Sequence, residues 1–103
     1  MSTYTPKFHN LPVSIQNVVK LAVQKLNPEK IFLFGSRARG DHRENSDFDI
    51  AVKGALSKMS WTQFAVDLQE ENLTLYSIDL VRLEELGNDY QKNIAKEGLL
   101  LYG

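Results

Sequence analysis

The sequence predicts a small α/β domain. Three observations indicate this fold class: a helical apolar pattern that ends at a proline, an uninterrupted apolar run that leads into a Gly-Ser turn, and further strand and helix patterns beyond that turn. Helices that alternate with strands are typical of a sheet covered by helices. The chain has 103 residues, the usual length of one domain, and 43% of them are hydrophobic. We therefore expect residues 1–103 to form a single domain, in which 1–10 are a loose lead-in.

The first third of the chain predicts a helix, a strand and a turn. Residues 11–26 carry apolar side chains at helical spacing, and Asn27-Pro28 should end this helix, because the residue before a proline disfavours the α conformation. Residues 30–35 contain four apolar residues without alternation, which predicts a strand covered on both faces. Residues 36–40 then form a turn or a short helical start. The residues that share the apolar helical face are Ile15, Val18, Val19, Ala22, Val23 and Leu26.

The middle of the chain predicts an exposed loop, a strand and a second long helix. Residues 41–46 are charged, and 47–53 form a short apolar run that predicts a strand. Ser60 and Gln63 match a capping box, so Ser60 should be the N-cap of the helix. The apolar stripe of that helix is Trp61, Phe64, Ala65 and Leu68.

The last third predicts a strand, a helix and an apolar tail. Residues 73–81 predict a third strand. One face would carry Leu73, Leu75, Ser77, Asp79 and Val81, and the other Thr74, Tyr76, Ile78 and Leu80. Residues 89–96 predict a helix, with Gly98 as its stop signal. Residues 99–102 are apolar and must be covered by another part of the protein.

Composition excludes several classes of function. The net charge is −1, so no overall basic field favours long nucleic acid, although a nucleotide needs only local positive charge. The chain has no cysteine and hence no disulfide or thiolate metal site. The N-terminus lacks the apolar core of a signal peptide, and no apolar run approaches the roughly 20 residues of a membrane-spanning helix. We expect a soluble, cytoplasmic protein.

Two aspartates at the start of the second strand offer a metal site. Asp47 and Asp49 are two residues apart and therefore point to the same face of a strand. Paired carboxylates repel each other unless a positive charge lies between them, and Mg²⁺ favours such oxygen ligands. Asp79 stands within an apolar strand pattern and can complete a three-carboxylate cluster if the strands are neighbours. In the alternative interpretation, Asp47 caps a turn, Asp49 pairs with an arginine and Asp79 is solvated.

The turn after the first strand offers a phosphate site. Gly35 allows close approach of a ligand to the backbone, and Ser36 offers a hydroxyl and an amide where a short helix would begin. Arg37 and Arg39 add charge suited to phosphate oxygens. The turn is neither a Walker A loop nor a Gly-x-Gly-x-x-Gly dinucleotide motif. The alternative is a tight turn with surface arginines.

The two motifs together resemble a known family. Gly-Ser-Arg-Ala-Arg-Gly at residues 35–40, followed by Ser-Asp-Phe-Asp at 46–49, is similar to the signature of the nucleotidyltransferase superfamily with a DNA polymerase β-like core. The best match is its minimal branch of short bacterial and archaeal proteins, and the likeness extends over nearly the whole chain. The resemblance implies an α+β core, which is a small mixed sheet with helices.

The resemblance also implies roles for these residues. Gly35 and Ser36 would hold the β and γ phosphates of ATP or another nucleoside triphosphate, with Arg37 and Arg39 nearby. The three aspartates, Asp47, Asp49 and Asp79, would serve catalysis with two Mg²⁺ ions, and Asp79 would lie near the acceptor.

Two functions remain open at this point. In the first, the protein is an enzyme that transfers a nucleoside monophosphate, AMP from ATP, to an acceptor hydroxyl. Minimal members of the family are often paired as antitoxins with a small helical HEPN-type protein, which implies a partner protein as acceptor, and a homodimer is the other option. In the second, the chain is a non-catalytic nucleotide-binding module that neutralises a partner by contact.

Overall fold

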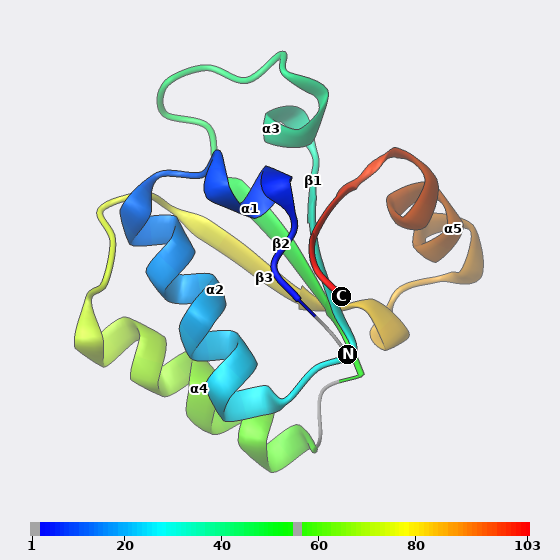
Figure 1. The fold of residues 1–103 in the computed structure, drawn as a ribbon. Coiled ribbons are helices and arrows are strands. Elements are labelled where there is room, and N and C mark those ends of the chain that lie inside the picture. Colours follow the sequence, from blue (N-terminus) through cyan, green and yellow to red (C-terminus); the bar gives the residue numbers. More distant parts are fainter. Residues whose placement is uncertain (1–2, 55–56) are drawn as a thin grey trace.

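A four-stranded sheet with helices on both faces forms the protein (Figure 1). The structure is a computed structural model and describes residues 3–54 and 57–103. The sheet order is β3-β2-β1-β4; β1 pairs antiparallel with β2 and β4, and β2 pairs parallel with β3. The mixed α/β sheet expected from the sequence is therefore confirmed. The strands are β1 (Lys30–Phe34), β2 (Phe48–Lys53), β3 (Ile78–Arg82) and β4 (Leu99–Tyr102).

Besides the strands, the described ranges contain five α-helices and one short 3-10 helix. Within those ranges, no helix is both long enough and apolar enough to cross a membrane. The helices are α1 (Pro6–His9), α2 (Val13–Leu26), α3 (Ser36–Arg39), α4 (Lys58–Glu71), η1 (Leu83–Glu85) and α5 (Asn88–Glu97).

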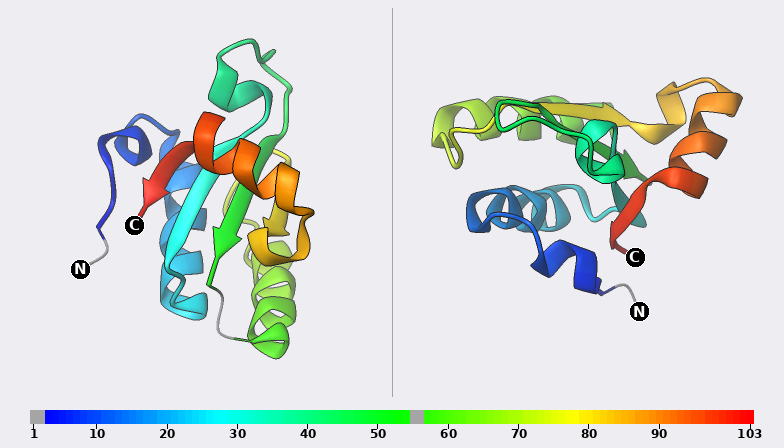
Figure 2. Two further views of the ribbon diagram at one scale, coloured as in Figure 1. Left: turned by 90° about the vertical axis from the view of Figure 1, so that its right-hand side faces the viewer. Right: turned by 90° about the horizontal axis from the view of Figure 1, so that it is seen from above.

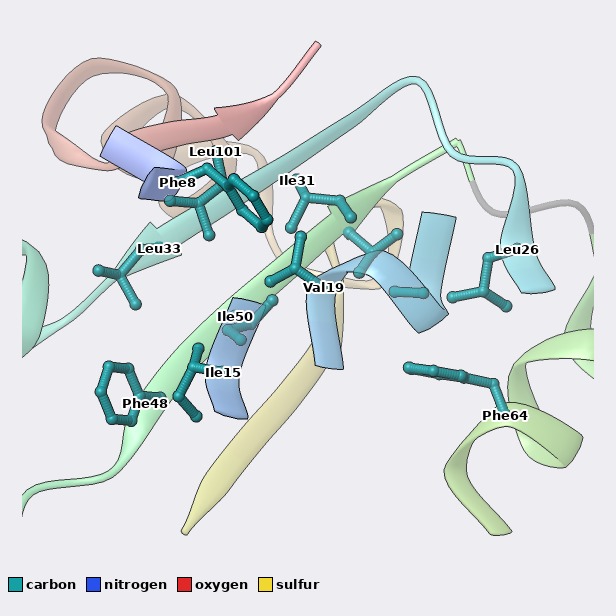
Figure 3. Close-up of a cluster of buried hydrophobic side chains, with 12 residues drawn as sticks. Phe8, Ile15, Val19, Leu26, Ile31, Leu33, Phe48, Ile50, Phe64 and Leu101 are labelled. Atoms are coloured by element: carbon teal, nitrogen blue, oxygen red, sulfur yellow. The ribbon is translucent and has the colours of Figure 1, made fainter. Parts of the chain in front are cut away.

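Two hydrophobic clusters lie on opposite faces of the sheet. The larger cluster joins the sheet to α1, α2 and α4, and Figure 3 shows its labelled side chains converging from these helices and from β1, β2 and β4. Alternation along β2 explains the division, because Ile50 packs into the larger cluster and Ala51 into the smaller one under α5. In the right-hand view of Figure 2, α5 is on the other side of the sheet from α2. This α5 face of the sheet carries the candidate site described below.

The predicted helices are present, with one corrected start. The apolar face of α2 is buried as expected, and Asn27 ends the helix in the left-handed conformation, with φ 47°. Helix α4 begins at Lys58, and its N-cap is Ser57, whose Oγ accepts a hydrogen bond from the Ser60 amide at 3.0 Å. The prediction that Ser60 is the cap is therefore wrong, because Ser57 and Ser60 both offer a capping hydroxyl and the first one is used.

The third strand is shorter than predicted. Strand β3 spans only Ile78–Arg82, and residues 73–77 have no regular strand structure. Leu75 in this segment is 98% exposed. The pattern over residues 73–81 overestimates the length of the strand, because residues 73–77 connect the end of α4 to the sheet.

Both ends of the described chain are ordered against the sheet. The apolar tail forms β4, which pairs with β1. The predicted loose lead-in is wrong for residues 3–10: Phe8 in α1 is 1% exposed, and Tyr4 pairs with Tyr102 of β4. Residues 1–2 lie outside the described part. Burial of one aromatic ring stabilises such a segment by roughly 2 kcal/mol, which explains why it packs.

Candidate functional site

A row of residues across three strands brings the predicted carboxylates to one place. In β1, β2 and β3, Phe34, Asp49 and Asp79 are successive register partners. Asp47 immediately precedes β2 and, being two residues from Asp49, points to the same face. Since Phe34 packs in the cluster under α5, this is the α5 face. The three aspartates therefore share one face and one end of the sheet, next to α3.

The carboxylates form an electrostatically strained group. Asp49 is half-buried, and its pKa is raised from the ordinary value of 3.8 by burial and then by the charges of Asp79 and Asp47, while Arg39 acts in the opposite direction. Asp47 and Asp79 are exposed. In residues 3–54 and 57–103, no three acidic or imidazole side chains are drawn together closely enough to form a ready metal-binding group. The oxygen donors and their mutual repulsion fit a divalent cation, which would relieve the repulsion.

Gly35 brings the turn directly against Asp49. Its backbone has φ 73° and ψ −157°, a region open essentially to glycine alone. A Cβ at this position would also collide with the Asp49 carboxylate. The turn and the carboxylate row are therefore in contact, and Ser36, the first residue of α3, follows at once.

The two arginines of the turn lie in different environments. Arg39 is exposed, and its Nε donates to Asp41 Oδ2 at 3.3 Å. Arg39 lines a pocket together with Gly35 and Phe34, and its charge partly offsets the rise in the pKa of Asp49.

Arg37 instead holds the loop that leads to Asp47. Its Nη2 donates to the carbonyl oxygens of Glu44 and Ser46 at 3.0 Å, and its Nε donates to Ser46 at 3.2 Å. Its guanidinium carbon lies 4.1 Å from the ring centroid of Phe48, a residue of the larger cluster on the other face of the sheet. At least part of the Arg37 guanidinium is therefore used by loop carbonyls, and a contact of Arg37 with a phosphate stays a prediction.

The sequence motifs did not include the residues of α5 that face this site. A pocket of about 230 Å³ lies between the turn and α5 and shares Gly35 and Arg39 with the turn. From α5 it is lined by Tyr90, Asn93 and Glu97, among others. The helical spacing of these residues places them on one face, but only the sheet topology shows what that face covers.

Asp49→Asn should stabilise the metal-free protein at neutral pH. Because the pKa of Asp49 is raised on folding, the folded chain binds this proton more tightly than the unfolded chain. The free energy of unfolding therefore falls as the pH rises from the pKa of Asp49 in the unfolded chain to its higher pKa in the folded chain. We expect a higher melting temperature for the variant at pH 7 in chelator, and a gain that shrinks as the pH is lowered through this window. If Asp49→Asn melts at a lower temperature than the wild type at pH 7, the carboxylate of Asp49 is not destabilised by burial and by its acidic neighbours.

Comparison with known protein families gives a match over most of the chain. The family model described as "Polymerase beta, Nucleotidyltransferase" matches residues 16–103. A Methanocaldococcus jannaschii protein named as a protein adenylyltransferase is 37% identical over 82 residues, which cover 72% of this chain and 78% of that protein. All of the predicted site residues lie within the matched range of the family model.

Solved structures of similar fold include nucleotidyltransferase and toxin–antitoxin chains. A chain of a toxin–antitoxin complex crystallised with AMP-PNP has a TM-score of 0.65 and 29% identity, and the match covers 84% of this chain and 70% of that one. A structure described as a minimal nucleotidyltransferase has a TM-score of 0.66 over 89% of this chain and 93% of its own; at 23% identity it supports the fold alone.

Proposed function

The chain belongs to the polymerase beta nucleotidyltransferase family, and from this premise we propose that it transfers AMP from ATP to an acceptor hydroxyl in a Mg²⁺-dependent reaction. It is a nucleotidyltransferase enzyme by family. One observation carries the finer proposal: the Gly35 turn touches Asp49, which is flanked by Asp47 and Asp79 on one face of the sheet. A phosphate-binding turn in contact with carboxylates is the arrangement that a metal–triphosphate complex requires.

The residues of the turn and of the carboxylate row have different roles in the proposed reaction. Gly35 and Ser36 hold the β and γ phosphates, and Arg39 adds positive charge from the end of α3. Asp47 and Asp49 would hold two Mg²⁺ ions, and Asp79 would be the third carboxylate. Bound Mg²⁺ would supply charge that stabilises the attacking and leaving oxygens of an in-line displacement.

The reaction is a substitution at the α-phosphorus. The acceptor oxygen forms a bond to the α-phosphorus, the bond from that phosphorus to the bridging oxygen of the β-phosphate breaks, and pyrophosphate leaves. Asp79, exposed at the edge strand β3, takes the proton of the acceptor hydroxyl. Arg37 contributes indirectly, since it fixes the loop before Asp47.

We further propose that the acceptor is a hydroxyl on a partner protein. The similar toxin–antitoxin chain supports this, and a small helical HEPN-type toxin is the partner we expect, with this chain as the antitoxin. Residues 1–103 would form one minimal nucleotidyltransferase domain, which acts in the cytoplasm and leaves recognition of the acceptor to the partner.

Two labels of ATP test the reaction. The protein is incubated with Mg²⁺ and a co-expressed partner, with ATP labelled at either the α- or the γ-phosphate. We expect the α label to become attached to protein and the γ label to be released as pyrophosphate. Chelation of the metal should abolish transfer, and excess Mg²⁺ should restore it.

The outcomes separate the alternatives. Attachment of the γ label would indicate phosphoryl transfer and contradict the proposal. Partner binding without attachment of either label would make the chain a non-catalytic nucleotide-binding module, and attachment to the chain itself would point to a second copy as acceptor.

A further inference from the structure

A second pocket, outside the proposed active site, combines basic and apolar side chains. It has a volume of about 250 Å³ and lies where α1, α3 and the loop after α3 come together (Figure 1). We propose that this pocket binds a small organic phosphate monoester, with the phosphate at its basic side chains and an apolar group against its wall. The inference is independent of the proposed AMP transfer. The pocket is lined by Lys7, Leu33, Arg37, His42, Phe48 and Leu99, among others.

The apolar wall places this pocket on the face of the sheet away from the aspartates. Leu33 and Leu99 are register partners in β1 and β4, and both pack in the larger hydrophobic cluster. Phe48 packs there too, because side chains alternate along a strand and Phe48 stands between Asp47 and Asp49. The pocket shares no lining residue with the pocket under α5. It is therefore separate from the carboxylate row.

The two cations of the pocket have no acidic partner in the described part of the chain. Lys7 and Arg37 line the pocket, and neither forms an ion pair within residues 3–54 and 57–103. Among those same residues, no Asp or Glu side chain lines the pocket. His42 adds a ring N–H that can donate a hydrogen bond. The pocket therefore offers positive charge and hydrogen-bond donors to an anion.

Arg37 is held in a fixed orientation at this pocket. Its Nε and Nη2 donate to the carbonyl oxygens of Glu44 and Ser46, whereas its Nη1 has no hydrogen-bond partner in the described ranges. The guanidinium carbon is 4.1 Å from the ring centroid of Phe48, so the charge lies directly beside the apolar wall. Because the side chain is already ordered, binding of an anion costs little further rotamer entropy.

The charge and the size of the pocket select the class of ligand. A phosphate monoester carries about two negative charges near neutral pH and three acceptor oxygens, which match two cations and an imidazole N–H better than a carboxylate does. The pocket is smaller than the roughly 300–1,000 Å³ of sites that enclose drug-sized ligands. The apolar group should therefore be small, such as a single ring.

Phenyl phosphate is the probe that tests the inference. We follow the backbone amides of the whole chain by nitrogen-15 NMR during a titration without Mg²⁺, and expect the amides of Lys7, His42 and Leu99 to shift. Inorganic phosphate, which lacks the ring, and phenol, which lacks the phosphate, should each bind about tenfold more weakly than phenyl phosphate.

A pair of lysine variants tests the contact. Lys7 is exposed, so Lys7→Ala should keep the wild-type melting temperature and weaken the binding of phenyl phosphate about fivefold. Lys20→Ala removes an exposed lysine of α2 that does not line the pocket, and it should bind like the wild type.

Four results would overturn the inference. The first is wild-type affinity in Lys7→Ala, and the second is equal affinity for inorganic phosphate and phenyl phosphate, because the apolar wall would then have no role. The third is the absence of any amide shift. The fourth is a set of shifts centred on Gly35 and Ser36, which would place the phosphate at the turn and would support the proposed triphosphate site instead.

Discussion

Asp49→Asn will lower the rate of AMP transfer by about 10³-fold or more, while the protein remains folded. Asp49 is the centre of the carboxylate row, since it is the register partner of Asp79 and follows Asp47 by two residues. Asparagine has nearly the same shape but cannot supply the negative charge that a divalent cation requires. The measurement is single-turnover transfer of the α label, at saturating Mg²⁺.

A matched carboxylate on the other side of the sheet provides the control. Asp67 on α4 accepts a hydrogen bond from Gln63 at 2.9 Å and lies far from the carboxylate row. Asp67→Asn should leave transfer unchanged. The loss in Asp49→Asn should also occur without a lower melting temperature, because the substitution removes repulsion. Transfer at the wild-type rate by Asp49→Asn would exclude this carboxylate as a metal ligand.

Gly35→Ala will both destabilise the protein and abolish transfer. The backbone at Gly35 occupies a region whose occupation costs other residues about 1–3 kcal/mol. For a domain of this size, each kcal/mol lowers the melting temperature by about 4–8 °C. The new methyl group would also displace the Asp49 carboxylate, so the turn and the proposed metal ligand could no longer meet.

Gly40→Ala separates backbone strain from displacement of the Asp49 carboxylate. Gly40 ends α3 with φ 84°, and a Cβ there would meet nothing within 4 Å. The variant should lose about 1–2 kcal/mol of stability from backbone strain alone and keep most of its transfer activity. If both glycine variants lose the same stability and retain the same activity, the close approach of Gly35 to Asp49 is not needed.

Local patterns predicted most of the fold. The apolar face of α2, the buried run of β1 and the helix before Gly98 were all confirmed, because each signal lies within one segment. The errors arose where distant parts of the chain decide the outcome. Nothing within residues 99–102 indicates that they pair with β1, and Phe8 is buried because α1 packs on the larger hydrophobic cluster, to which β4 contributes Leu101.

The site was predictable in part for the same reason. Asp47 and Asp49 lie in one motif, and their shared face follows from strand geometry. The partnership of Asp49 with Asp79 depends on parallel pairing of β2 and β3, which spacing alone does not determine. The contacts of Arg37 with the loop carbonyls could not be predicted from the sequence, because both turn arginines suit phosphate and the direction of α3 decides which of them lies beside the loop. Tyr90 and Glu97 face the site only because α5 returns over the sheet.

The contact between the N-terminal segment and β4, the last strand, has a consequence for folding kinetics. Tyr4 pairs with Tyr102, and the Thr5 amide donates to the Leu101 carbonyl at 3.0 Å, so this contact closes a loop of more than ninety residues (Figure 1). Strand β1 is likewise synthesised early, but one of its edges can pair only when β4 has been synthesised. Contacts of such long sequence separation slow folding, because loop-closure entropy is lost before they form. During synthesis, then, the apolar edge of β1 stays open until residues 99–102 have emerged, and this interval is when the nascent protein is most exposed to aggregation.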